Sequence, residues 1–156
     1  MSHKRIEIRA VIADVLRRKL SFTTKVHSNR VTNIATDELP AVVVSTPEEE
    51  VHVFSAAPRL YLRKLTVVVE AAASGESLDN HLDAHAVEIE QALAAEERLG
   101  GLTRELVLMK SETVLDQSSD RPLGSVRLTY LATYITDETF PQPMEAFRVA
   151  HVRLVQ

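Results

Sequence analysis

The segment Leu60 to Ala72 is the longest strand pattern in this chain, and it constrains the fold more than any other stretch. Its side chains alternate between two faces, and apolar residues occur on both of them. Tyr61 and Leu65 belong to one face, whereas Leu62 and Val68 belong to the other. We therefore expect this segment to be the main strand of a sheet.

Further strand patterns precede this segment. Leu39 to Ser45 is rich in β-branched residues and opens with a proline, which suits the start of a strand rather than its middle. Thr46 to Glu50 is expected to form a turn or loop tip, and Val51 to Phe54 to begin the next strand, which Ala57-Pro58 breaks. A short strand fragment is expected around Lys25 to His27.

The C-terminal half predicts a β-hairpin followed by a tail. Arg104 to Leu115 and Ser125 to Thr136 have strand patterns, and the residues from Asp116 to Gly124 have a turn composition. We expect an antiparallel hairpin with a long tip. In the tail, Phe140-Pro141-Gln142-Pro143 favours extended backbone, and the alternation from Val149 to Val155 predicts a terminal strand.

Two segments have the apolar spacing of amphipathic helices. The first runs from about Arg5 to Leu20. The second follows Ser77, the expected N-cap, and Gly100-Gly101 is expected to end it. The apolar stripes consist of Ile8, Val11, Ile12, Val15 and Leu16 in the first helix and Leu78, Leu82, Ile89 and Leu93 in the second.

These elements predict a single domain of the α+β class. A chain of 156 residues with 45% hydrophobic and 26% charged residues has the length and composition of one globular domain. The order of elements predicts a mainly antiparallel β-sheet with two α-helices packed on one face. We expect the domain to span residues 1–136 and a C-terminal extension to span residues 137–156.

Charge is distributed unevenly along the chain. Residues 1–30 hold eight Lys/Arg and two Asp/Glu, whereas residues 31–156 hold ten and twenty. Seven acidic residues and no Lys or Arg lie from Glu76 to Glu97. Opposite charges of this kind suit head-to-tail contact between copies, with Arg17 and Arg18 as candidates on the basic side. The net charge of −4 and the scarcity of aromatic residues argue against nucleic-acid binding.

No motif predicts catalysis or a cofactor. The chain has no cysteine, which excludes a thiolate zinc site and a cysteine nucleophile, and its four glycines form no phosphate-binding loop. His81 and His85 have the i, i+4 spacing of a metal-ligand pair, but a closed zinc site needs four ligands. We interpret them as a surface and a boundary histidine, and we expect no metal, no cofactor and no enzymatic activity.

Several polar and exposed positions are candidates for protein contacts. Glu48-Glu49-Glu50 is interpreted as a solvated charge run or a cation contact, and Arg59 and Arg63 as solvated strand ends or a grip on an acidic partner. Val87 is either a lone surface valine or part of a contact face of small residues. Loop and tail positions complete the set, because loops carry function on a rigid scaffold. The candidate interaction residues are Arg17, Arg18, Glu48, Glu49, Glu50, Arg59, Arg63, Val87, Asp120, Arg121, Phe140 and Phe147.

The order of these signals resembles a known family. A basic N-terminal helix precedes LPAVVV, then RLYLRKLTVVVEAAA, then the helix SLDNHLDAHAVEIEQALAAEERLGG and finally GSVRLTYLATY. Over residues 5–136 this order is similar to the tail terminator (tail completion) proteins of tailed bacteriophages, the family of the phage lambda minor tail protein U. The best local match is the block from Leu78 to Gly101.

The resemblance implies a structural subunit that assembles with itself into a hexameric ring on the tail tube. The ring would stop tube polymerisation and offer a surface to the head-tail connector protein, at the head-proximal end of the virion tail. Assembly would take place in the bacterial host cytoplasm, with no membrane and no sequence-specific nucleic acid as partner. Residues 137–156 depart from the shortest family members, and we expect them to lie across a neighbouring subunit or the tube.

Two alternatives stay open at this point. One is another structural protein of a phage, such as a head-tail connector or a tail-tube-like subunit. The other is a small metal-dependent hydrolase that uses His81, His85 and an acidic neighbour.

Overall fold

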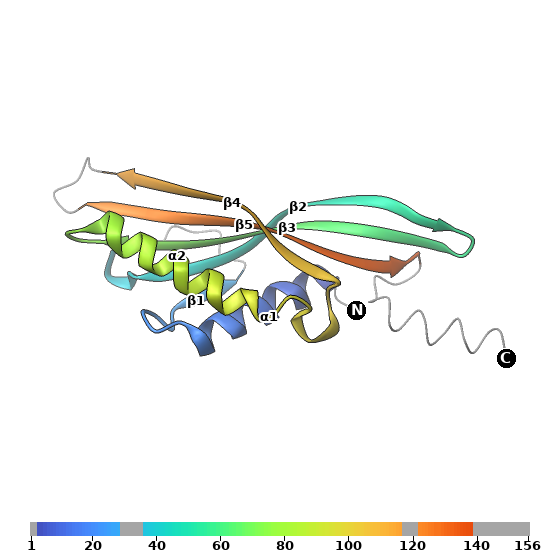
Figure 1. Ribbon diagram of the computed structural model, residues 1–156, viewed down its shortest axis with the longest axis horizontal. Coiled ribbons are helices and arrows are strands. Elements are labelled where there is room, and N and C mark those ends of the chain that lie inside the picture. Colours follow the sequence, from blue (N-terminus) through green and yellow to red (C-terminus); the bar gives the residue numbers. More distant parts are fainter. Residues whose placement is uncertain (1–2, 29–35, 117–121, 139–156) are drawn as a thin grey trace.

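The structure, a computed structural model, describes residues 3–28, 36–116 and 122–138. Five strands form one sheet in the order β1-β2-β3-β5-β4, and two α-helices lie against one face of it (Figure 1). Neighbouring strands are antiparallel except β1 and β2, which run parallel. The elements are α1 (Lys4–Lys19), β1 (Val26–Ser28), β2 (Ala41–Ala56), β3 (Arg59–Ser74), α2 (Leu78–Ala94), β4 (Glu105–Asp116) and β5 (Leu123–Asp137), with 3₁₀ turns at Thr36–Glu38 and Leu99–Gly101. The predicted α+β class is confirmed.

β3 and β5 form the centre of the sheet and pair along their whole length. Their register runs from Leu60 opposite Asp137 to Ser74 opposite Leu123 without a shift. Because successive side chains point to opposite faces, every second residue of each strand reaches the helix-covered side. The segment that carries the longest strand pattern, predicted to be a strand, is therefore the central strand of the fold.

The main core lies between this sheet and the two helices. α1 contributes Ile8, Ile12 and Leu16, all fully buried, and the stripe of α2 is buried in the same way. The strands contribute many β-branched and aromatic residues to the core, and such residues suit a half-buried pleated surface. The strand residues of the core are Val26, Val42, Val44, Leu65, Val67, Val69, Ala71, Ala73, Leu106, Val126, Leu128, Tyr130, Ala132 and Tyr134.

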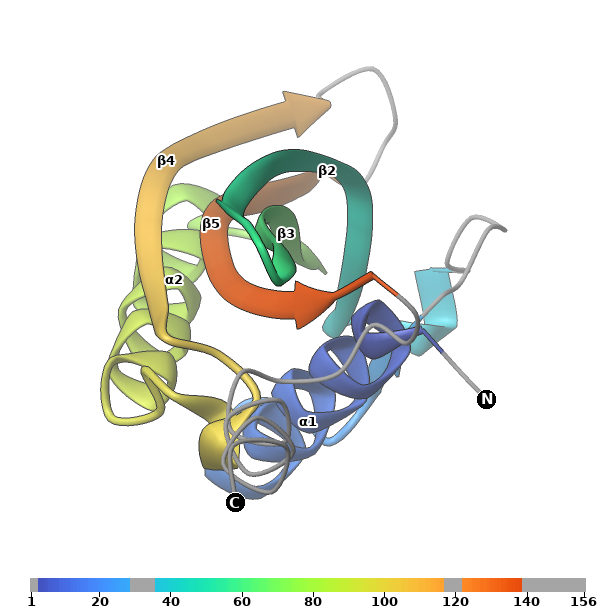
Figure 2. The same cartoon turned by 90° about the vertical axis from the view of Figure 1, so that its right-hand side faces the viewer.

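The helices cover only part of the sheet. Figure 1 shows the β2–β3 hairpin and the C-terminal end of β5 extending past both helices, and Figure 2 shows that these strands curl strongly. Leu60 and Ile135 are buried in this projecting part but lie outside the main core. The guanidinium of Arg104 lies 5.7 Å from the centre of the Phe54 ring. The curled sheet thus brings β2 close to the start of β4.

The predicted turn at Thr46 to Glu50 is wrong. These residues continue β2, which joins the two strand segments expected on either side of them. The register between β2 and β3 shifts between Ser45 and Glu48, so Thr46 and Pro47 lie at a bulge. A proline is tolerated at such a point because its missing N–H interrupts no regular ladder. Alternation then separates the three glutamates, with Glu48 and Glu50 exposed and Glu49 turned inward.

The ends of α2 also differ from the prediction. Ser77 occupies the N-cap position, but its side chain makes no capping hydrogen bond and its backbone is left-handed, with φ of 53°. The helix ends at Ala94, before the glycine pair. Gly100 and Gly101 instead supply the positive φ values of 68° and 97° that turn the chain toward β4.

The predicted hairpin of β4 and β5 is confirmed. Its strands extend further than expected, because Asp116 is the last residue of β4 and Gly124 already lies in β5. The tip is therefore shorter than the sequence predicted.

Candidate functional site

The described part of the chain shows no cluster of metal-binding side chains. Within these residues, no group of three or more His, Asp or Glu side chains is placed to hold a metal ion. None of the helices in the described ranges has the length and apolar character needed to cross a membrane. The candidates that the described residues offer are a pocket, a buried charge network and exposed apolar surfaces.

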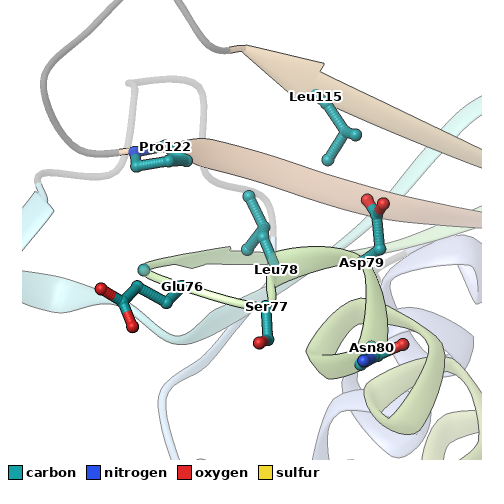
Figure 3. A pocket seen from close by; sticks show the side chains of 8 residues that line it. Glu76, Ser77, Leu78, Asp79, Asn80, Leu115 and Pro122 are labelled. Atoms are coloured by element: carbon teal, nitrogen blue, oxygen red, sulfur yellow. The ribbon is translucent and has the colours of Figure 1, made fainter.

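An open pocket of about 370 Å³ lies at the start of α2. Figure 3 shows Leu78 and Leu115 pointing toward each other, while the carboxylate of Glu76 points away from them. Gly124 permits this approach, because a Cβ there would lie 2.9 Å from Cδ2 of Leu115 and 3.0 Å from Cδ2 of Leu78. The acidic groups do not converge on one point, so the pocket lacks the geometry of a catalytic site.

A buried charge network lies at the base of the projecting β2–β3 hairpin. Glu49 accepts hydrogen bonds from the hydroxyl of Tyr134 and from Arg63, the latter at 2.9 Å. Arg63 also donates to the hydroxyl of Thr136 at 2.8 Å. The side chains of Glu49 and Arg63 are only 4% and 15% exposed. Because these residues come from β2, β3 and β5, the network ties the three strands of the projecting part together.

The first turn of α1 begins beside this network. His3 is the N-cap: its ring nitrogen accepts a hydrogen bond from the N–H of Arg5 at 3.1 Å. The opposite ring nitrogen lies 3.9 Å from the Glu49 carboxylate. Burial lowers the pKa of His3, with a further contribution from the positive charge of Arg5. The imidazole is therefore neutral at pH 7, and its contact with Glu49 is not an ion pair.

The phenol of Tyr134 is held in its protonated form. Burial raises the pKa of Tyr134 well above its usual range, and its hydrogen bond to Glu49 raises that pKa further. A protonated phenol donates, and the carboxylate accepts. The network is therefore a structural brace in which Glu49 carries the negative charge and Arg63 the positive charge.

The projecting hairpin carries exposed apolar residues, which we call the hairpin patch: Val51, Val53 and Phe54. Val53 is 60% exposed, the highest value among these three. The segment of β2 that holds them has no strand on its outer side within the described residues, because β1 pairs only with Val42 to Val44. Arg59 is exposed beside the turn of the same hairpin.

A second exposed apolar surface lies on β4, the outermost strand on the opposite side of the sheet. We call it the edge patch: Val107, Leu108, Met109, Val114 and Leu115. Met109 is 60% exposed and lies where the register of β4 and β5 shifts. Exposed apolar edge strands are typical of surfaces that pair with another chain.

The charged segments predicted to join neighbouring copies interact partly within one chain. Lys19 pairs with Glu96 of the acidic region at 3.2 Å. Arg17 pairs with Asp14 at 2.8 Å and donates to the carbonyl of Val26 at 2.7 Å. Arg17 therefore helps to fix β1 against α1. Arg18 is exposed, so its predicted role as a contact between copies stays a prediction.

The acidic run and the second candidate arginine are also used within the chain. Glu49 and Arg63 bind each other, and both side chains are largely buried within the subunit. Glu48 is exposed, and Glu50 lies 3.5 Å from His52. Because alternation points them away from Glu49, the three glutamates do not form a common cation site.

Val87 is exposed on the outer face of α2, at 51%. His81 is exposed on the same helix, whereas the ring of His85 stacks on Phe22 with ring centres 3.7 Å apart. Burial lowers the pKa of His85. The predicted surface and boundary positions of the two histidines agree with these environments. Asp120, Arg121, Phe140 and Phe147 lie outside the described residues.

Two features of these surfaces were not predicted from the sequence. Nothing in the local pattern around Glu49 indicates a partner as remote as Tyr134, because only the strand order brings them together. The edge patch has a signal in the sequence: Leu106, Val107, Leu108 and Met109 form an apolar run without alternation. A strand with such a run is either buried on both faces or exposes apolar side chains on one face. The position of β4 at the edge of the sheet determines that these side chains are exposed.

The described residues thus combine a braced hairpin of β2 and β3 with an exposed apolar edge on β4. The sequence profile of a protein family described as phage minor tail protein U matches residues 3–134, and the chain belongs to this family. The family predicted from the sequence is therefore confirmed. No curated protein matches the chain. Membership makes the protein a structural component of a phage tail in the virion, and it points to a role without catalysis.

Proposed function

We propose that this protein is a tail terminator. Copies assemble into a ring, as a hexamer, that caps the head-proximal end of the tail tube. The ring stops polymerisation of the tube and presents a surface to the head-tail connector protein. Membership of the phage minor tail protein U family over residues 3–134 is the observation that carries the proposal.

The surfaces of the subunit support assembly into a ring. In a head-to-tail ring, every subunit uses two different patches, one for each neighbour. The hairpin patch and the edge patch are two unlike apolar surfaces, one on β2 and the other on β4, the last strand of the sheet. The braced base of the hairpin supports this role, because a rigid contact surface loses less conformational entropy on binding.

Electron microscopy with tube protein tests the proposal. Tail tube protein of the same phage is allowed to polymerise with and without the purified chain, and tube lengths are measured. We expect shorter tubes that carry a ring at one end. Tubes of unchanged length without rings would contradict the function as a terminator.

Two matched variants locate the subunit contact. Val53→Lys changes the hairpin patch and Val87→Lys changes the outer face of α2, and both positions are highly exposed. We expect Val53→Lys to raise the protein concentration needed for ring formation by about tenfold, the effect of roughly 1.4 kcal/mol. If Val87→Lys raises this concentration more than Val53→Lys does, the contact lies on the α2 face.

A further inference from the structure

The outer edge of β4 is available for strand pairing. β4 is the last strand of the sheet, and its outer side has no strand partner within the described residues. The register shift between Leu108 and Lys110 divides it, and from Lys110 to Asp116 its pairing with β5 is regular. A regular edge with exposed apolar residues is a template for one more strand.

The C-terminal tail contains a segment whose sequence fits this edge. Val149 to Val155, which lie outside the described residues, alternate between an apolar set and a set that contains His151 and Arg153. The segment equals Lys110 to Asp116 in length. From Lys110 to Asp116 the edge has a net charge of −1, with Glu112 3.0 Å from Lys110, whereas Arg153 is the formal charge of the tail segment. The tail segment and the edge of β4 therefore match in length, and they have alternating side chains and opposite charge.

We propose that Val149 to Val155 of one copy adds to the edge of β4 in a neighbouring copy as an antiparallel strand. Arg153 then lies opposite Glu112, and Leu115 faces Ala150 on the helix-covered side. Strand addition of this kind gains affinity from main-chain hydrogen bonds and specificity from alternate side chains. The proposal rests on the self-assembly proposed above and names the contact that carries it.

The length of β5 favours a neighbour over the same chain as the acceptor of this strand. In this register Val149 lies opposite Asp116, which pairs with Leu123 at the start of β5. The tail leaves from the other end of β5, at Asp137, about 46 Å away along the strand. A fully extended linker to Val149 spans at most about 43 Å. Within one chain the linker would have to run nearly fully extended past the whole length of β5, whereas a neighbouring copy can present its β4 at any point along the tail.

Two charge-reversed variants of the full chain test the contact. Glu112→Arg places like charges opposite each other, and so does Arg153→Glu, so each variant alone should assemble about fivefold less readily at low salt. In an equimolar mixture, each edge meets a tail of opposite charge. We expect the mixture to recover assembly in sedimentation velocity, with both variants in the same particles by native mass spectrometry.

Glu105→Arg serves as the matched control, because it reverses a charge on β4 outside the regular segment. It should leave assembly unchanged, and melting curves of all variants show whether they fold. A cysteine-free chain also allows a cross-linking test that needs no charge reversal. Thr113→Cys with Val152→Cys should give disulfide-linked dimers and larger species, whereas Ala94→Cys with Val152→Cys should not.

The outcomes separate this contact from the proposed function. Normal assembly of Glu112→Arg and Arg153→Glu, each alone, overturns the strand addition but leaves the ring. Defective variants that fail to recover when mixed, or a disulfide formed within one chain, place the strand on its own β4 and overturn the contact between copies. A wild-type chain that stays monomeric with and without tail tubes overturns both proposals.

Discussion

Ile89 and Val87 lie two residues apart on α2 but in opposite environments. Ile89 is fully buried against the sheet, whereas Val87 is exposed on the outer face of the helix. The helical period alone separates them, because residues two apart on a helix do not share a face. The same contrast occurs on β2, where Glu49 is enclosed and Glu48 is exposed. These pairs provide matched substitutions.

Ile89→Ala should lower the free energy of unfolding by about 2–5 kcal/mol, because it removes buried apolar atoms and leaves a cavity. Val87→Ala should change it by less than about 0.5 kcal/mol, the usual limit for a surface position. Urea unfolding followed by circular dichroism measures both values. Equal effects would show that the outer face of α2 is as important to the fold as its inner face.

Glu49→Gln should destabilise the fold by about 3 kcal/mol, because Arg63 is left without its counter-charge in a largely buried site. Glu48→Gln, in the same strand, should be nearly neutral. The double substitution Glu49→Leu and Arg63→Met should recover part of the loss, since apolar replacement of a buried pair removes both charges together. A loss equal to that of Glu49→Gln would show that the network cannot be replaced by packing.

At the scale of elements, the amphipathic helices and the central strands were predictable because each shows a period that a single buried face imposes. The interruption at Thr46 to Glu50 misled the prediction, because proline and consecutive charges are also typical of turns. The bulge that accommodates them depends on the partner strand. The local sequence does not show how two strands are aligned with each other. For the same reason the contact between Glu49 and Tyr134 was not predictable.

The contact of α2 with the segment after α1 should make stability depend on pH. His85 stacks on Phe22, and burial lowers its pKa below 6.5. Glu88 opposes this shift and His81 adds to it. Because the unfolded chain then binds the proton more readily, this contribution is complete above about pH 6.5 and is lost as the pH falls below that value. Unfolding by urea at pH 7.5 and 5.5 measures the difference.

His85→Gln keeps a planar side chain but cannot titrate in this range. The fall in stability between pH 7.5 and 5.5 should be smaller in this variant than in the wild type. His81→Gln, on the exposed part of the same helix, should retain most of the wild-type dependence, because His81 is the smallest of the causes that shift the pKa of His85. If His85→Gln behaves like the wild type, His3 is the better explanation, since burial lowers its pKa in the same direction.

At the scale of the whole molecule, the described subunit is a sheet with one face covered and both outer edges partly open. The sequence predicted the covered face, because burial produces periodic patterns, but it did not predict the edge patch. An edge strand and a central strand can carry the same residues, and only the strand order distinguishes them. The uneven distribution of charge was visible in the sequence. Only the structure shows that part of it is neutralised within one chain, in the ion pair of Lys19 and Glu96.

The whole fold should be independent of bound metal. A core of apolar side chains spans both helices and the sheet, and the described residues offer no cluster of metal ligands. EDTA should therefore leave the melting temperature unchanged within about 1 °C. A decrease of several degrees that zinc reverses would contradict this prediction and would indicate a metal site at His81 and His85.

The uninterrupted pairing of β3 and β5 has a mechanical consequence. Both strands pass from the helix-covered part into the projecting part in one register, so no joint separates the hairpin from the body. A load applied along the strands is shared by the whole ladder of hydrogen bonds at once, whereas a load across them would break the bonds one after another. A force applied at the tip of the β2–β3 hairpin is thus transmitted along β3 and β5 to the helix-covered part of the subunit.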